Sequence, residues 1–344
     1  MAPGSAVDDH PPVTPIPGPP TAADLTEDTI VRHRPDRPEA GWRYLLLRTT
    51  AGLVNAGPSE AERQRRLLLR RIRAPLTGAH RIAVSSIKGG VGKTTVSSCL
   101  GLVLAEHRGD RVVAIDANPD AGTLADRLTG ETSVTVRELL HDLDNIRSWA
   151  DVSRYTSLIG RLQVLASEQD PAGGDAFSRE EYEHASRVLG RFFNIVITDS
   201  GTGLVHSAME GTLRSADSLI VVGAPTVDGS SRASKTLDWL HAQGHASLAA
   251  AAIVVLSCDR GSAEIHTDKV RSHFEARCRA VVEVPHDPHL ATGGRIELSR
   301  LQRGTVDAFL ELGALVADRF TARPGPAAPP PSPAFDGARQ PPPG

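Results

Sequence analysis

The chain has 344 residues, 40% of them hydrophobic, and a formal charge of −3, which suits one large or two small globular domains. Its near-neutral charge gives no whole-chain sign of nucleic-acid binding. The three cysteines are widely spaced without a Cys-x-x-Cys pair, so they predict buried thiols rather than a disulfide framework. No apolar run approaches the roughly 18 residues of a membrane span, and no signal-peptide pattern is present. We therefore expect a cytoplasmic protein without a transmembrane segment.

Proline is concentrated at both ends of the sequence. Residues 1–40 and residues 321–344 each contain nine of the 25 prolines and show little hydrophobic periodicity. Such segments bury too little apolar surface to offset the entropy of the chain. They are predicted to be disordered tails, which leaves a lead-in at 41–80 and a larger domain at 81–320.

The lead-in 41–80 is predicted to form two helices. A short amphipathic helix covers Trp42 to Val54, and the Gly57-Pro58 pair ends it. The pattern Ser59-x-x-Glu62 is a capping box that begins the second helix, because each side chain can satisfy a free backbone amide of the other residue.

Arginine dominates the second helix of the lead-in. Residues 41–80 contain eight arginines and two glutamates, a local charge of +6. Four arginines repeat at 3-4-3 spacing and so share one helix face: Arg63, Arg66, Arg70 and Arg73. Two interpretations remain open, a solvated helix packed on the larger domain or a docking surface for anionic lipid, DNA or an acidic partner.

A glycine-rich loop joins a predicted strand at 81–86 to a predicted helix at 96–106. The loop reads Lys88-Gly89-Gly90-Val91-Gly92-Lys93-Thr94-Thr95 and holds two of the four lysines of the chain. Glycines allow successive backbone amides to turn toward anionic oxygens, and the helix N-terminus adds partial positive charge. The strand–loop–helix order predicts a nucleotide phosphate site, with Lys93 near the β- and γ-phosphates and Thr94 on Mg²⁺.

Strands and helices alternate along the rest of the chain. Further predicted strands cover 111–115, 162–165, 195–198, 218–222, 253–256 and 281–284, and further predicted helices cover 135–143, 179–192 and 307–320. This alternation predicts an α/β fold with a mostly parallel sheet and helices on both faces. Ligands bind at the carboxyl ends of such strands.

Two aspartates follow predicted strands at this binding edge. Asp116 comes after the strand at 111–115, and Asp199 comes after the strand at 195–198. A Mg²⁺-nucleotide site needs carboxylate oxygens near the metal and near the attacking water. The phosphate loop and both aspartates are therefore predicted to converge.

The loop resembles the deviant Walker A motif of the MinD/ParA family of P-loop NTPases. Ile87 stands where the strict motif has its first glycine, and Lys88 matches the leading lysine of the deviant form. Other stretches resemble an actinobacterial subgroup associated with type VII (ESX) secretion; they include Gly41-Trp42-Arg43, Asp116-Ala117-Asn118-Pro119-Asp120, Thr198-Asp199-Ser200-Gly201 and Val284-Pro285-His286-Asp287. The resemblance covers about residues 41–320.

The resemblance implies an ATPase that forms a homodimer around ATP. In the family the leading lysine, here Lys88, reaches the nucleotide of the partner subunit. Phosphate contacts are implied for Gly89, Gly90, Val91, Gly92, Lys93, Thr94 and Thr95, and Mg²⁺ contacts for Thr94 and Asp199. Asp116 and Asn118 would lie near the attacking water. The family has a second aspartate where this chain has Asn118, and a neutral amide cannot accept a proton, so we expect slow hydrolysis.

Adenine contacts are implied at two further loops. The late-strand motif of the family matches Cys258-Asp259-Arg260, although its usual asparagine is absent here, and the last-strand loop matches Pro285. Asp259, Arg260 and Pro285 are therefore candidate nucleotide contacts.

Three function classes compete for this sequence. The first is an ATP-binding, slowly hydrolysing dimeric switch for positioning, partitioning or secretion-system assembly, with possible attachment to membrane or nucleoid through 41–80. The second is a nucleotide-gated binding module with negligible hydrolysis that acts through the arginine-rich segment. The third is a metabolic P-loop enzyme such as a kinase or ligase. Lys88 argues against this class, because it matches the motif of the dimeric switches. The sequence does not reveal the partner.

Overall fold

A computed structural model describes residues 37–39, 41–86, 89–118, 122–130, 134–167, 178–201, 207–258 and 266–321. The predicted tails, 1–40 and 321–344, lie outside these residues except for 37–39 and Thr321. The chain divides into two compact units, residues 1–63 and residues 64–344. Within the described ranges, no helix is both long enough and apolar enough to span a bilayer.

The first unit contains helix α2 (Gly41–Thr49) and the beginning of α3 (Glu60–Ile72). The predicted capping box is confirmed, since the Ser59 amide donates to Glu62 Oε2 at 2.6 Å and the Glu62 amide donates to Ser59 Oγ at 3.2 Å. None of the residues of α2 is buried, and Trp42 is 66% exposed. The predicted apolar side of this helix is therefore only partly covered, with Leu46 and Leu47 half-buried.

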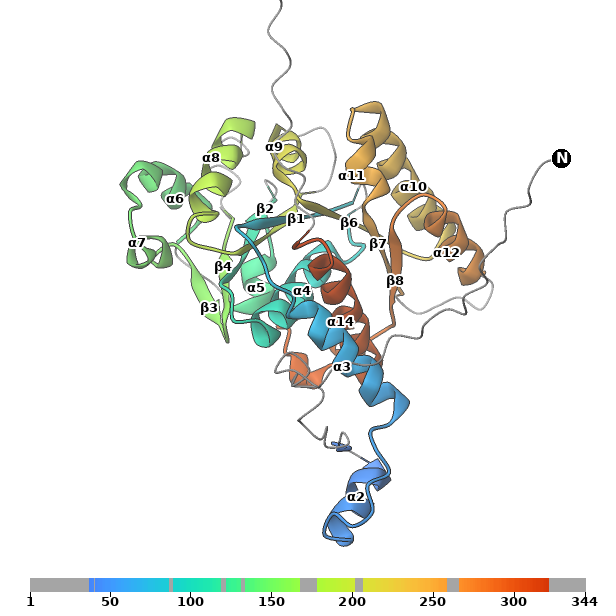
Figure 1. The fold of residues 1–344 in the computed structure, drawn as a ribbon. Coiled ribbons are helices and arrows are strands. Elements are labelled where there is room, and N and C mark those ends of the chain that lie inside the picture. Colours follow the sequence, from blue (N-terminus) through green and yellow to red (C-terminus); the bar gives the residue numbers. More distant parts are fainter. Residues whose placement is uncertain are drawn as a thin grey trace, which may run out of the picture. The chain divides into compact units, whose positions relative to one another are not determined.

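The second unit is built on one sheet. Its strands are β1 (His80–Ser85), β2 (Val112–Ala117), β3 (Ser157–Ile159), β4 (Leu162–Leu165), β5 (Ile195–Ser200), β6 (Ser218–Gly223), β7 (Ile253–Ser257) and β8 (Ala280–Val284). Their order in the sheet is β3-β4-β2-β5-β1-β6-β7-β8, and only the β3–β4 pair is antiparallel. The predicted mostly parallel sheet is confirmed, and β1, which leads into the glycine loop, lies at its centre (Figure 1).

Helices cover both faces of this sheet (Figure 1). The helices of the second unit are α4 (Lys93–His107), α5 (Leu124–Leu128), α6 (Val136–Asp142), α7 (Trp149–Ser153), α8 (Arg179–Leu189), α9 (Ser207–Ser215), α10 (Val227–Ala242), α11 (Ala246–Ala250), α12 (Thr267–Glu275), α13 (Pro288–Ala291) and α14 (Arg303–Ala317), with 3-10 turns at Leu143–Asn145 and Leu298–Arg300. Alternate strand residues pack on opposite faces, because successive side chains of a strand point to opposite sides. Thus Val112 packs with α4 and α14, whereas Val113 packs with α6 and α8.

The end of α3 is anchored on the core of the second unit. Ile72 is fully buried, and Leu68 and Leu69 pack against the cluster that contains α4 and α14. Arg71 forms an ion pair with Asp318 at 2.7 Å. This part of the arginine-rich segment is a helix packed on the larger unit, while its charged face is still open to solvent at Arg70 and Arg73.

Where a predicted element is present, the main differences concern its ends, whereas β3 and several helices, α10 among them, were not predicted. The predicted strands 111–115 and 195–198 extend to Ala117 and Ser200, so Asp116 and Asp199 lie inside β2 and β5 rather than after them. The predicted closing helix 307–320 begins four residues earlier, at Arg303. Parallel ladder bonds extend both strands through their polar ends, since Asp116 pairs with Asp199 in register.

Candidate functional site

The carboxyl ends of β2, β5 and β1 form one continuous edge. Asp116 of β2 lies opposite Asp199 of β5, and Val84 of β1 lies opposite the same Asp199. The Ser200 hydroxyl donates to the Val84 carbonyl at 2.7 Å, which joins the ends of β5 and β1. The convergence of both aspartates with the strand that enters the phosphate loop is therefore present in the structure.

The described part of the loop has backbone geometry that favours glycine. Gly90 and Gly92 have φ angles of 74° and 94°, in the left-handed region that side chains rarely adopt. A Cβ at Gly90 would meet no atom within 4 Å. Gly92 is also the N-cap of α4 and provides no side-chain cap, so the first amides of this 15-residue helix are not satisfied by a capping side chain. This arrangement is suited to an anion.

Lys93 and Asp199 are buried beside each other under the loop. Lys93 is 8% exposed, and burial lowers the pKa of its ammonium group while the charge of Asp199 opposes this change. Burial raises the pKa of Asp199 to about 6, despite hydrogen bonds from the hydroxyls of Thr94 and Ser97 and the charge of Lys93. The Ser97 bond measures 3.1 Å. Buried charges of this kind need polar partners to offset their desolvation.

Asp116 is held by backbone amides. Its Oδ1 accepts from the Asn118 amide at 3.1 Å, and its Oδ2 accepts from the Leu124 amide at 3.0 Å. Burial and then the charge of Asp199 raise its pKa to about 7, against the effect of these two hydrogen bonds. A Cβ at Gly122 would lie 2.0 Å from Oδ2, so only glycine allows the backbone to approach this carboxylate.

The donor set matches the needs of Mg²⁺. The Thr94 hydroxyl is hydrogen-bonded to the Asp199 carboxylate, so two oxygen groups lie next to each other, and Mg²⁺ prefers oxygen together with waters and phosphates. Among the residues that the structure describes, no group of three His, Cys, Asp or Glu side chains is placed to hold a metal. A site completed by a nucleotide's phosphates is thus a better fit than a cage made only of protein ligands.

The remaining predicted site residues differ in where they lie. Lys88, Asp259 and Arg260 lie outside the described residues. Pro285 follows β8 at the same edge of the sheet, three strands from β1, and is exposed. Asn118 lies directly after β2, with its amide on Asp116.

Sequence reasoning missed three contributors to this site. Ser97 follows Lys93 by one helical turn and could have been found by that spacing. Gly122 and Arg127 have no such local signal. Gly122 permits the close approach to Asp116, and the Arg127 guanidinium lies 3.3 Å from Thr95 Oγ1.

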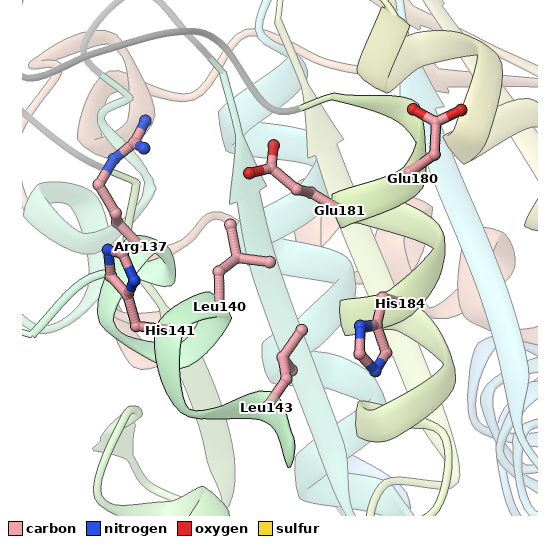
Figure 2. A pocket seen from close by; sticks show the side chains of 7 residues that line it. All are labelled: Arg137, Leu140, His141, Leu143, Glu180, Glu181 and His184. Atoms are coloured by element: carbon pink, nitrogen blue, oxygen red, sulfur yellow. The ribbon is translucent and has the colours of Figure 1, made fainter. Parts of the chain in front are cut away.

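A second concavity lies between α6 and α8, with a volume of about 290 Å³. Figure 2 shows Arg137 and His141 on one side and Glu181 and His184 on the other. Its lining residues are Arg137, Leu140, His141, Leu143, Glu180, Glu181 and His184. Because α8 packs on the sheet face opposite α4, this pocket is separate from the phosphate loop.

Comparison with known families gives a match over residues 82–291 to the CobQ/CobB/MinD/ParA nucleotide binding domain. The matched region begins in β1 and contains the glycine loop and both aspartates. The chain belongs to this family. Membership in the CobQ/CobB/MinD/ParA family confirms the predicted resemblance and the P-loop NTPase fold class.

A curated relative of this family member is the ESX-1 secretion-associated protein EspI of Mycobacterium tuberculosis. The two are 33% identical over 286 residues, which cover 82% of this chain and 42% of EspI. The chain therefore spans less than half the length of this relative.

Solved structures show the same fold for this CobQ/CobB/MinD/ParA domain. A ParA family ATPase from Chlorobium tepidum matches with a TM-score of 0.60 and 16% identity, covering 68% of this chain and 98% of its own. The septum site-determining protein MinD from Pyrococcus horikoshii, solved with Mg-ADP, matches with a TM-score of 0.56 and 19% identity, covering 68% and 94%.

Proposed function

We propose that this protein is a Mg-ATP-dependent dimeric switch that hydrolyses ATP slowly. The observation that supports it best is the buried Lys93–Asp199 pair beneath a glycine loop at the uncapped start of α4. Lys93 supplies a cation, the start of α4 supplies backbone amides, and Asp199 supplies carboxylate oxygens. The phosphates of a nucleotide and their metal ion require all three kinds of group.

Each residue of the site has a proposed role. Lys93 and the amides of residues 89–95 bind the phosphates, and Thr94 and Asp199 would hold Mg²⁺, which would neutralise phosphate charge when bound. Asp116 and Asn118 orient water near the terminal phosphate. Asn118 has no basic carboxylate, and this is the proposed reason for slow turnover.

Further contacts extend this proposal beyond the described phosphate site. Lys88 would contact the nucleotide of the partner subunit, and Asp259, Arg260 and Pro285 would contact the adenine. In this scheme residues 81–320 form the nucleotide-binding domain and residues 41–80 form its lead-in.

Replacing Lys93 with alanine should weaken ATP binding about 100-fold, roughly 2.7 kcal/mol, and abolish phosphate release. Lys93→Ala removes the buried cation but leaves the loop backbone in place. Lys269→Ala on the exposed surface of α12 is the matched control and should bind ATP like the parent. Calorimetric titration and a phosphate-release assay measure both quantities. Equal ATP affinity in parent and Lys93→Ala would contradict the proposed site.

The first unit supports a second candidate, a nucleotide-gated binding module with negligible turnover. Trp42, Leu45 and Leu53 are 66%, 60% and 89% exposed, and Arg43 and Arg48 lie among them without any acidic residue from 41 to 59. An exposed apolar and basic segment is suited to an anionic lipid surface or an acidic partner. Tight ATP binding without phosphate release would favour this candidate.

The proposed dimer should depend on the edge that carries the phosphate loop. Val227 begins α10 just after β6, at this edge, and is 86% exposed. Val227→Glu should prevent ATP-dependent dimerisation, because a charge cannot be desolvated there without a partner. Light scattering with ADP and with ATP measures the mass.

Leu158→Glu is the control for this experiment. Leu158 is 60% exposed on β3, the outermost strand of the sheet on one side, and its substitution should leave dimerisation intact. A parent protein that stays monomeric with ATP would refute the dimer, and loss of the dimer in both variants would refute the location of its interface.

The likeness to EspI favours a role at a secretion system over chromosome partitioning. EspI is ESX-1 secretion-associated by name, and this chain matches it over most of its own length. We place the protein in the cytoplasm, with peripheral attachment through 41–80, and expect its partner to be a component of such a system.

A further inference from the structure

Arg127 is a half-buried arginine of α5 that has no acidic partner among the described residues. Its guanidinium Nη2 lies 3.3 Å from Thr95 Oγ1 and 3.5 Å from the Leu290 carbonyl oxygen. Its Nε is shielded from solvent and has no hydrogen-bond partner. Among the described residues, none of the ion pairs includes Arg127. Burial lowers the pKa of this guanidinium, which remains charged at neutral pH.

An uncompensated cation in this position is costly. Two weak contacts with neutral oxygens replace only part of the water that a guanidinium loses on burial. By contrast, the buried Arg108 has an acidic partner, since it forms an ion pair with Asp110 at 2.6 Å. A bound anion would supply the hydrogen-bond acceptors and the negative charge that the Arg127 guanidinium lacks among the described residues.

The neighbours of Arg127 indicate which anion this is. Thr95 is the last residue of the phosphate loop, two positions beyond the buried Lys93. Leu290 belongs to α13, a few residues after Pro285, which is a proposed adenine contact. One guanidinium nitrogen of Arg127 contacts both Thr95 and Leu290, so the side chain lies where the phosphate loop meets the segment that follows the proposed adenine contact.

We infer that Arg127 binds the phosphate of the nucleotide that is nearest to the ribose. This inference rests on the proposed function, because it assigns a residue to the same nucleotide site. Arginine suits the role, since its planar group can donate to a phosphate oxygen while still contacting Thr95. Because α5 follows the loop held by Asp116, the contact also links the nucleotide to that loop.

The test replaces Arg127 with methionine, which keeps much of the side chain's volume and removes its charge. ADP and ATP should both bind about tenfold or more weakly, by the same factor, because they share the phosphate next to the ribose. The melting temperature of the nucleotide-free protein should stay the same or rise, because an unpaired buried charge is removed.

Arg295→Met is the matched control. Arg295 joins the same two regions through the carbonyls of Leu128 and Thr129, at 3.4 Å and 2.9 Å, and both of these contacts lie away from the phosphate loop. It should leave the affinity for ADP and ATP unchanged.

Three outcomes overturn the inference. If Arg127→Met lowers the melting temperature of the nucleotide-free protein and leaves both affinities unchanged, Arg127 only clamps α5 to its neighbours. A loss confined to ATP would place it at the terminal phosphate instead. If the parent protein binds neither nucleotide, the proposed function itself fails together with this inference.

Discussion

The nucleotide-free protein should lose stability as the pH rises from about 4 to 7, because of Asp116. Burial and the neighbouring charge of Asp199 raise the pKa of Asp116 to about 7, whereas the carboxyl of an unfolded chain titrates near pH 4. Between these values the unfolded chain has released this proton and the folded chain has not. Stability from this group is therefore complete below pH 4 and lost as pH rises, by roughly 4 kcal/mol in all.

The Asp116→Asn substitution should destabilise the protein at acidic pH and stabilise it above neutral pH. At pH 5 the variant should be less stable than the parent by about 1 kcal/mol, since an amide can accept only one of the two bonds from Asn118 and Leu124. At pH 8 the variant should be more stable, because no buried charge has to form. Urea unfolding in the absence of Mg²⁺ and nucleotide measures the difference.

Asp287→Asn provides the opposite control. Asp287 is also buried, but amides that include those of Gln302 and His289 outweigh desolvation, and its pKa lies below the usual value. Its stabilising effect should be present above pH 4 and should be lost as the pH falls below this value. A difference between parent and Asp116→Asn that stays constant from pH 5 to pH 8 would show that Asp116 is ionised throughout.

Arg108→Ala should lower the free energy of unfolding by about 2–4 kcal/mol. The Arg108 side chain is 4% exposed and pairs with Asp110 at 2.6 Å. It donates to the carbonyls of Ile72 and Ala74 and lies over the Phe320 ring, 4.6 Å from its centroid. Its loss would leave two carbonyls without a donor and a cavity next to an aromatic ring. Chemical denaturation measures the change.

Arg73→Ala is the matched control for this substitution. Arg73 also joins the end of α3 to the end of α4, by a bond to the His107 carbonyl at 3.3 Å, but it is exposed. We expect a loss below about 0.5 kcal/mol. Equal losses for the two variants would show that the arginine at the α3–α4 contact stabilises through charge alone, not through buried hydrogen bonds.

The sequence predicted the centre of the fold well, because its strands are continuous apolar runs. Parallel strands covered on both faces have this pattern, and β4 was predicted with its exact residues, Leu162–Leu165. The short edge strand β3 has no such pattern. Leu158 at its middle is 60% exposed, and three residues give no periodicity.

Helix α10 was missed for a different reason. Its first turns contain Gly229 and several serines, which indicate a loop when taken locally. In the structure a Cβ at Gly229 would lie 2.6 Å from the Ala224 carbonyl oxygen, so the glycine allows close packing of the helix start against the end of β6. A residue that breaks helices in isolation is here required by tertiary contact.

In the candidate site too, residues with a local sequence signal were predicted and residues that depend on tertiary contacts were not. The loop, Asp116 and Asp199 were found because each lies next to a strand that the sequence identifies. The contacts of Gly122 with Asp116 and of Arg127 with Thr95 depend on how β2, α5 and α4 pack together. No local pattern contains that information, since the contacts join residues on different elements.

The central position of β1 affects the order in which the protein becomes functional during synthesis. The two neighbours of β1 are β5 and β6, which begin at Ile195 and Ser218, long after Ser85 has left the ribosome. At about 5–20 residues per second, the wait from residue 85 to residue 195 is on the order of 10 s. During that time the phosphate loop has no sheet to hold it, so a nascent chain cannot engage nucleotide until most of the domain has been translated.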